Sequence, residues 1–90
     1  MRFPEEVNDD VLKRLSRLEG QIRGVQRMVE EGKDCREIVT QLSACKAALD
    51  RVGYRLVVGG MRYCVSTPDG SEVEGEIDVD ELERLFMKLS

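Results

Sequence analysis

Apolar residues recur along two long stretches of the chain with alternating spacings of four and three positions. In the first stretch they are Val11, Leu15, Leu18, Ile22, Val25 and Val29. In the second they are Ile38, Leu42, Cys45, Leu49, Val52 and Leu56. This spacing places apolar side chains on one face of a helix and differs from the strict alternation of a strand. The pattern predicts two long helices, each with one apolar seam.

Polar residues and a glycine mark the expected ends of these helices. Asn8 is a good N-cap for the first helix, with the residues before it forming a loose arm. Gly32 is well placed to end that helix in a left-handed turn. Asp34 followed by Glu37 predicts a capping box, which puts Cys35 in the first turn of the second helix. We therefore expect an antiparallel helix hairpin with a short connection.

The second helix is predicted to run from Asp34 to Cys64. Gly59 and Gly60 near its end together cost roughly 2 kcal/mol relative to alanine, so a bend or a break at that point stays open. Residues 66–77 contain a Pro-Asp-Gly turn signal and several acidic residues, and they are predicted to form an acidic loop.

A short third helix is predicted near the C-terminus. Asp78 and Glu81 form a second possible capping box. The apolar residues that follow on one face are Leu82, Leu85, Phe86 and Leu89. The fold class is therefore all-α: a three-helix protomer in which residues 1–90 form a single domain. Ninety residues bury a limited core by themselves, so an oligomer is expected.

The predicted second helix carries a cysteine near each end. At about 1.5 Å per residue, a continuous helix separates Cys35 from Cys64 by roughly 40 Å, so the two thiols of one chain cannot meet. Two such helices packed antiparallel would bring Cys35 of one protomer beside Cys64 of the partner, twice per dimer. Any joint chemistry of these thiols is expected between chains, provided that the helix does not break at the glycines.

The three cysteines are expected to differ in their roles. Thiolate is the reactive form of cysteine and a helix N-terminus favours it, so Cys35 is the predicted nucleophile. Cys45 lies on the apolar seam, where a cysteine behaves as a small hydrophobic residue. Cys64 is expected to be partly exposed, with Arg55 and Arg62 near enough to stabilise its thiolate.

An odd number of cysteines without a C-x-x-C pair favours free thiols in a reducing compartment, so we expect a cytoplasmic protein.

The chain contains no histidine. Nickel, cobalt and zinc sensors normally use imidazole, and two cysteines are too few for the tetrahedral site that zinc prefers. Cu(I) stays possible because it accepts soft thiolates in low coordination. Without histidine the chain lacks the side chain most often used in general acid–base catalysis, so an enzyme is not expected. A thiol-transfer enzyme and a plain helical assembly protein are the other classes left open.

The charges are divided unevenly along the chain. The net charge is −4 overall, yet residues 11–55 carry +4 and residues 64–90 carry −6. An oligomer can therefore present a positive face to DNA. The basic residues off the two seams are Arg14, Arg17, Arg23, Arg27, Lys46, Arg51 and Arg55. Scattered charge usually means a solvated helix surface, and the sequence has no zinc-finger, basic-zipper or clear helix-turn-helix pattern.

Residues 14–53, RLSRLEGQIRGVQRMVEEGKDCREIVTQLSACKAALDRVG, resemble the copper-sensitive operon repressor family (CsoR/RcnR). The likeness continues to Cys64-Val65. It implies an antiparallel dimer, a dimer-of-dimers tetramer and repression of an operon. Copper sensors of this family bind the metal through a cysteine at the start of the second helix and a histidine and a cysteine near its end. Cys35 and Cys64 match the two cysteines, whereas Gly60 occupies the histidine position.

The missing histidine, the segment ALDRVGYRLVVGGMRYCV and the closing DVDELERLFMKLS are similar to the persulfide-sensing, CstR-like branch of that family. The resemblance implies that a low-molecular-weight persulfide or polysulfide links Cys35 to Cys64 across the dimer and releases operator DNA. No cofactor and no membrane partner are expected. The alternative is a Cu(I)-responsive repressor that uses the same two thiolates.

The family resemblance also points to residues that bind operator DNA. Arg14 and Arg51 match basic positions implicated in operator binding in the family. Arg17 and Lys46 are added from the neighbouring surface. These four residues are the predicted DNA contacts.

Overall fold

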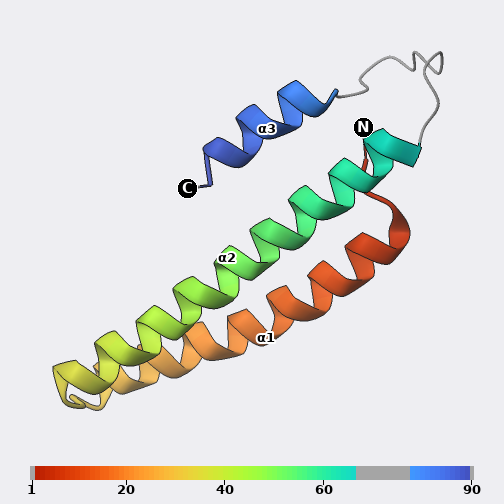
Figure 1. Cartoon of the computed structure of the whole chain (residues 1–90). Helices are drawn as coiled ribbons and strands as arrows, with labels where there is room; N and C mark the ends of the chain where they lie inside the picture. The colour runs from red at the N-terminus through yellow and green to blue at the C-terminus, as the bar shows by residue number, and fades with distance from the viewer. Residues whose placement is uncertain (1, 67–77, 90) are drawn as a thin grey trace.

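The computed structural model describes residues 2–66 and 78–89, with the backbone alone for residues 63–66. It contains helices α1 (Glu5–Glu30), α2 (Cys35–Ser66) and α3 (Val79–Met87), and no strand occurs among the described residues. α1 and α2 form an antiparallel hairpin, and α3 lies along the C-terminal half of α2 (Figure 1). The predicted all-α, three-helix protomer is confirmed. No helix in the described part of the chain is long and apolar enough to cross a membrane.

α1 begins earlier than predicted. Its N-cap is Pro4 and its first helical residue is Glu5, so the prediction of a start at Asn8 was wrong. The backbone N–H of Asn8 donates to the Pro4 carbonyl at 3.0 Å, because Asn8 already belongs to the first turns of the helix. Glu5 and Glu6 lie in the first turn, where the helix dipole favours negative charge. The expected loose arm is therefore shorter than predicted.

The turn between α1 and α2 has the predicted glycine. Gly32 adopts a left-handed conformation with φ of 66°. Its N–H donates to the Val29 carbonyl at 3.1 Å, and the N–H of Lys33 donates to the Met28 carbonyl at 3.0 Å. These are the two hydrogen bonds of a Schellman motif, which satisfies the last carbonyls of α1. The motif reverses the chain and lets α2 begin at Cys35.

The C-terminal half of α2 is continuous although it contains two adjacent glycines. The helix runs through Gly59 and Gly60 to Ser66, so they do not break it. Both glycines are buried, and neighbouring side chains fill the space that a β-carbon would need. A β-carbon at Gly59 would lie 2.7 Å from a Val7 methyl carbon of α1. Close packing against α1 and α3 thus compensates for the low helix propensity of this stretch.

α3 begins where the sequence predicts. The Asp78 carboxylate accepts a hydrogen bond from the Glu81 N–H at 2.8 Å, which is one half of the expected capping box. Leu82 is buried against α2, whereas the other residues of its apolar face are exposed in the single protomer. Those residues are Leu85, Phe86 and Leu89. Apart from Ser66, which ends α2, the predicted acidic loop lies outside the described residues.

The core of the single protomer is small. The buried apolar residues among those described are Val11, Leu18, Cys45, Val52 and Leu82. The predicted seam of α2 divides along its length, because Cys45 and Val52 are buried while Leu42 and Leu49 are 55% and 54% exposed. On α1, Ile22 is likewise exposed although the spacing predicts it on the seam. The apolar stripe on the hairpin is therefore broader than the contact between α1 and α2 covers.

Candidate sensing and DNA-binding sites

Cys35 is the first residue of α2, and its side chain is exposed. Asp34 caps this end of the helix, although not in the predicted manner. Its carboxylate accepts from the Arg36 N–H at 2.8 Å, whereas the Glu37 N–H donates to the Asp34 backbone carbonyl at 3.0 Å. The cap fixes the start of α2 at Cys35, and the exposed thiol is accessible to a small molecule in the single protomer.

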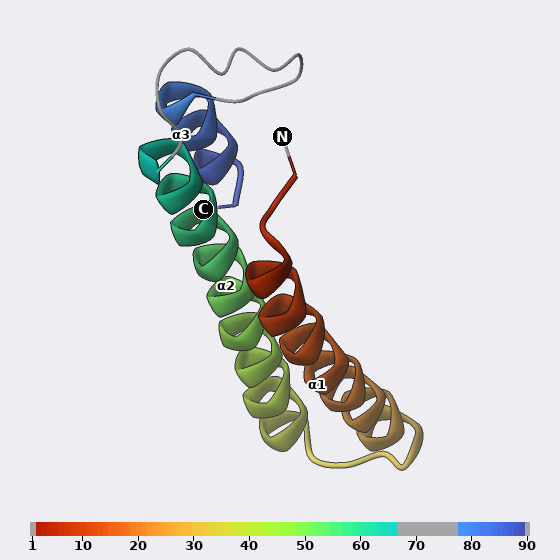
Figure 2. The same cartoon turned by 90° about the vertical axis from the view of Figure 1, so that its right-hand side faces the viewer.

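Cys64 lies two residues before the end of α2, and its side chain is outside the described atoms. Since α2 is one continuous helix, Cys35 and Cys64 are roughly 40 Å apart along its axis. Figure 2 shows α2 extending without a break from the hairpin turn to the far end of the molecule. One chain therefore cannot bring these two thiols together.

Cys45 differs from Cys35 in its surroundings. It is only 6% exposed, while Cys35 is exposed. The predicted burial of Cys45 on the seam is thus confirmed. A thiol buried between helices is poorly placed to react with a molecule in solvent.

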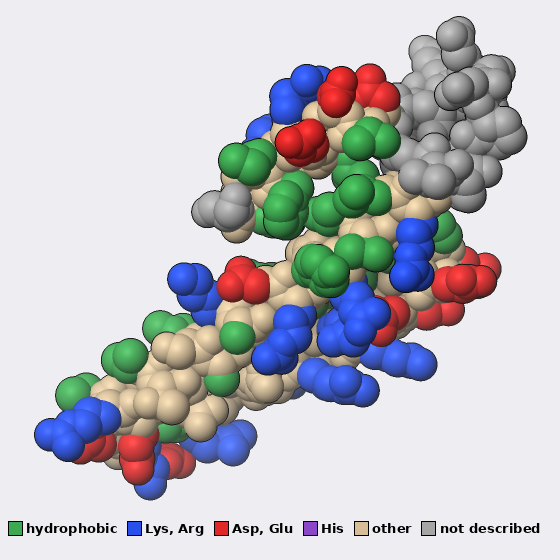
Figure 3. Space-filling view, in the orientation of Figure 1, with side chains coloured by type: hydrophobic (Ala, Val, Ile, Leu, Met, Phe, Trp, Pro, Cys, Tyr) green, Lys and Arg blue, Asp and Glu red, His purple; other side chains and the backbone are tan. Residues whose placement is uncertain are grey.

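Three arginines form a row on α2. Arg51, Arg55 and Arg62 are exposed and lie within a sector of roughly 40° around the helix axis. The predicted contact Lys46 is five residues before Arg51, so it lies roughly 140° away around the helix. The structure therefore places Arg51 and Lys46 on different faces of α2. In Figure 3, Lys and Arg side chains gather over the middle of the hairpin.

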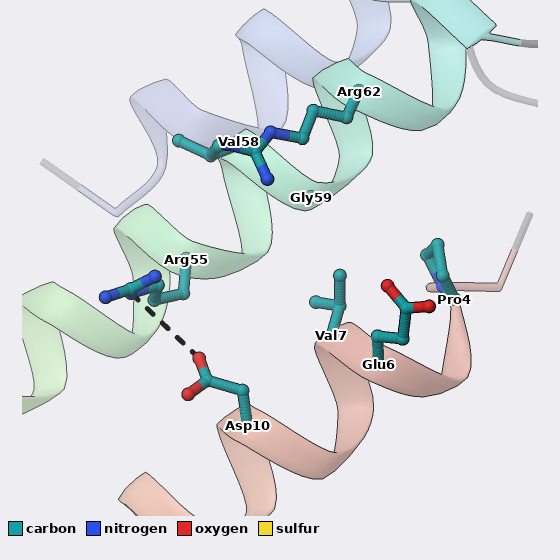
Figure 4. A pocket seen from close by; sticks show the side chains of 8 residues that line it. All are labelled: Pro4, Glu6, Val7, Asp10, Arg55, Val58, Gly59 and Arg62. Atoms are coloured by element: carbon teal, nitrogen blue, oxygen red, sulfur yellow. Dashed lines mark ion pairs between the residues drawn. The ribbon is translucent and has the colours of Figure 1, made fainter.

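Arg14 of α1 joins this row through Asp10. The Arg14 Nε donates to both carboxylate oxygens of Asp10, at 3.2 and 3.3 Å. The Arg55 Nε lies 3.9 Å from the same carboxylate, across the gap between the helices (Figure 4). Arg17, one turn beyond Arg14, is exposed. Asp10 was not among the site residues predicted from the sequence, although its position four residues before Arg14 is a usual signal for an ion pair on a helix.

Arg55 has a contact that was not predicted from the sequence. It pairs with Asp10 of α1, and it precedes Cys64 by nine residues, or roughly 13 Å along the helix. The predicted stabilisation of the Cys64 thiolate by Arg55 stays a prediction, because the Cys64 side chain lies outside the described atoms. A small pocket of about 310 Å³ lies beside the Arg55–Asp10 pair, between the N-terminal part of α1 and the C-terminal half of α2 (Figure 4).

Comparison with known proteins identifies the family. Residues 7–88 match the family model of metal-sensitive transcriptional repressors. The chain belongs to that family. Its members are described as repressors, which is the class that the sequence favours over an enzyme.

Several members of the metal-sensitive repressor family resemble this chain closely. The copper-sensing transcriptional repressor CsoR of Bacillus subtilis (strain 168) is 38% identical over 82 residues, which are 91% of this chain and 80% of that protein. The copper-sensing repressor RicR of Mycobacterium tuberculosis (strain ATCC 25618 / H37Rv) is 45% identical over 58 residues, which are 64% of this chain and 60% of that protein.

A solved structure of the metal-sensitive repressor family has the same fold. The crystal structure of the copper-sensing repressor CsoR with Cu(I) from Geobacillus thermodenitrificans NG80-2 superposes with a TM-score of 0.70 at 36% identity. The match covers 99% of this chain and 88% of that one.

The residues of this family member fit a three-ligand copper site only in part. Gly60 occupies the position that the family resemblance assigns to a histidine ligand, and the sequence contains no histidine. A β-carbon at Gly60 would lie 3.1 Å from both δ-carbons of Leu82 and 3.4 Å from a ring carbon of Phe3. No group of three possible metal-binding side chains occurs in the described part of the chain. Of the three positions that the family resemblance assigns to a copper site, Cys35 and Cys64 keep a thiol, and Cu(I) accepts thiolates in low coordination.

Proposed function

We propose that this protein is a repressor that binds operator DNA while Cys35 and Cys64 are reduced. A low-molecular-weight persulfide or polysulfide then links these two cysteines between neighbouring protomers and releases the DNA. The observation that carries the proposal is the continuity of α2 from Cys35 to Ser66. A continuous helix requires that a link between the two thiols joins two chains.

The chemistry needs only thiols and a sulfur donor. The Cys35 thiolate attacks the outer sulfur of a persulfide R–S–SH, becomes Cys35–S–SH and releases RS⁻. Cys64 of the partner is converted in the same way. The outer sulfur of its persulfide anion then attacks the inner sulfur of the Cys35 persulfide and displaces HS⁻. The product is a trisulfide, and the sulfur donor supplies the oxidising equivalents.

The proposal requires an oligomer, and the exposed apolar residues of the hairpin support one. The large apolar residues exposed on α1 and α2 are Leu12, Ile22, Val29, Val39, Leu42, Leu49, Tyr54 and Met61. Large exposed apolar surfaces mark interaction sites. We infer that these apolar residues pack against further copies of the chain in an antiparallel dimer, and that two dimers form a tetramer.

Cu(I) is the second candidate effector, and the comparisons favour it over persulfides. Both relatives named above are copper-sensing repressors, and the solved structure contains Cu(I). The absence of histidine and the close packing at Gly60 favour thiol chemistry instead. Both candidates use Cys35 and Cys64, so the two hypotheses differ in the effector rather than in the site.

Mass spectrometry combined with an operator-binding assay tests the proposal. The reduced protein is treated with polysulfide or with one equivalent of Cu(I), and DNA binding and intact mass are measured on the same samples. We expect polysulfide to release DNA and to add whole sulfur atoms to a covalent dimer. Release by Cu(I) with no response to polysulfide would assign the protein to the copper sensors. Failure of the reduced protein to bind its operator would refute the repressor function itself.

A further inference from the structure

The Asp10 carboxylate draws together two arginines from different helices. Its Oδ2 atom lies 3.2 Å from the Arg14 Nε and 3.9 Å from the Arg55 Nε. The two Nε atoms are therefore no more than about 7 Å apart. The Arg14 side chain is 28% exposed, so its position is restricted by its surroundings.

The contacts with Asp10 leave most donors of both arginines available. A guanidinium group has five N–H donors, of which Nε carries one. Arg14 reaches Asp10 through Nε in both hydrogen bonds, and the closest approach of Arg55 is also through Nε. The four terminal N–H donors of each arginine make no hydrogen bond within the described part of the chain. Guanidinium groups bind phosphate oxygens with hydrogen bonds of about 2.8 Å, and one phosphate can accept from two arginines at this separation.

We infer that Asp10 positions Arg14 and Arg55 as one clamp for a single phosphate of the DNA backbone. This inference rests on the proposed DNA-binding function and adds Arg55 and Asp10 to the interface. Arg51 and Arg62 extend the positive row along α2 on either side of Arg55.

The acidic neighbours of the clamp do not cancel its charge. Glu6 lines the pocket next to the Arg55–Asp10 pair, and its side chain is exposed. The two carboxylates of Glu6 and Asp10 stand beside the three arginines 14, 55 and 62. Over these five side chains the net charge is +1, which suits a phosphodiester with its single negative charge.

A double-mutant cycle on operator binding tests the clamp. Arg14→Ala and Arg55→Ala should each weaken binding about fivefold at physiological salt, because each removes donors from a phosphate. The double variant should be weakened less than tenfold, well below the product of the single effects, because both arginines contact the same phosphate. In the double variant the slope of log K against log salt should change by about 0.9 for each protomer that contacts DNA, the value for one phosphate, and not by about 1.8.

The same two arginine substitutions are then measured in the Asp10→Ala background. Without the carboxylate, the two arginines are no longer held together, so their effects on binding should multiply. Arg23→Ala is the matched charge control, since Arg23 is exposed and lies roughly 180° from Arg14 around α1. It should change affinity less than twofold.

The outcomes separate the clamp from the repressor function. Multiplying effects of Arg14→Ala and Arg55→Ala in the native background would overturn the clamp, as would unchanged affinity in Arg55→Ala. In both cases the native protein still binds operator DNA and the repressor function stands. Absence of operator binding by the native, reduced protein would remove both proposals. Circular dichroism of each variant establishes that α1 and α2 remain folded.

Discussion

Val7 of α1 lies directly against Gly59 of α2, at a distance that leaves no room for a side chain. A β-carbon at position 59 would come within 2.7 and 2.9 Å of the two methyl carbons of Val7. This contact fixes the approach of α1 to the C-terminal half of α2. Along α2, the contact lies between Arg55, which faces Asp10, and the end of the helix that carries Cys64.

The contact predicts that Gly59→Ala destabilises the protein. The forced separation of the helices should cost about 1–3 kcal/mol, partly offset by up to about 1 kcal/mol from the better helix propensity of alanine. Val7→Ala should restore stability in the double variant by removing the clashing methyl groups. Chemical denaturation measures both changes.

Gly20→Ala is the matched control for this prediction. Gly20 lies inside α1, and a β-carbon there would have no neighbour within 4 Å in the protomer. The substitution should stabilise α1 by up to about 1 kcal/mol. Equal stability of Gly59→Ala and Gly20→Ala would contradict the proposed clash.

The separation of Cys35 from Cys64 predicts a covalent dimer after persulfide treatment. The species should appear on non-reducing gels and should disappear on reduction, because the link joins two chains. Cys35→Ala should abolish the covalent dimer. Cys64→Ala should still take up sulfur at Cys35 but should form no dimer, and Cu(I) should give no crosslink. A monomeric product with an intramolecular link would contradict the continuous helix.

The burial of Cys45 predicts a structural role. Cys45→Ala should leave the response to persulfide unchanged and should lower the free energy of unfolding by about 1 kcal/mol, as for a small truncation in a core. The response is measured as release of operator DNA, and stability by denaturation. If the variant is stable but no longer responds, Cys45 belongs to the sensing site.

The two predicted contacts on the arginine row should differ from Lys46. Arg14→Ala and Arg51→Ala should each weaken operator binding and lessen its dependence on salt, with the smaller change in slope for Arg14→Ala because Arg55 shares its phosphate. Lys46→Ala is expected to have a smaller effect, since Lys46 faces away from this row. Fluorescence anisotropy at several salt concentrations measures the slopes. Equal slopes for the native protein and for both arginine variants would exclude those arginines from the interface.

The helical fold followed from local patterns in the sequence. The four-three spacing, Gly32 and Asp78 predicted the two long helices, the turn between them and the start of the third helix. The start of α1 was missed because Asn8 is a strong capping residue, whereas Pro4 carries no side-chain acceptor. The burial of seam residues was only partly predictable. Periodicity places Leu42 and Cys45 on the same stripe but does not say which one faces α1.

The candidate site was predictable only where it depends on distance along one helix. The separation of Cys35 from Cys64 follows from helix geometry once α2 is continuous, and that continuity depends on Val7 and Leu82 packing against the glycines. The pairing of Arg55 with Asp10 joins residues 45 positions apart in sequence. No local pattern specifies how two helices meet, so this ion pair required the structure.

The continuous α2 has a consequence for the register of the proposed dimer. An antiparallel pair that places Cys35 of one protomer level with Cys64 of the partner must have its two-fold axis at the midpoint, between Leu49 and Asp50. Leu49 is exposed in the protomer, so an apolar side chain is available next to that axis. If the two α2 helices slide past each other by one turn, roughly 5 Å, the thiols at both ends lose contact together. The spacing of the two cysteines along α2 therefore determines the register that the dimer needs. An insertion or deletion between them would misalign both sensing sites at once.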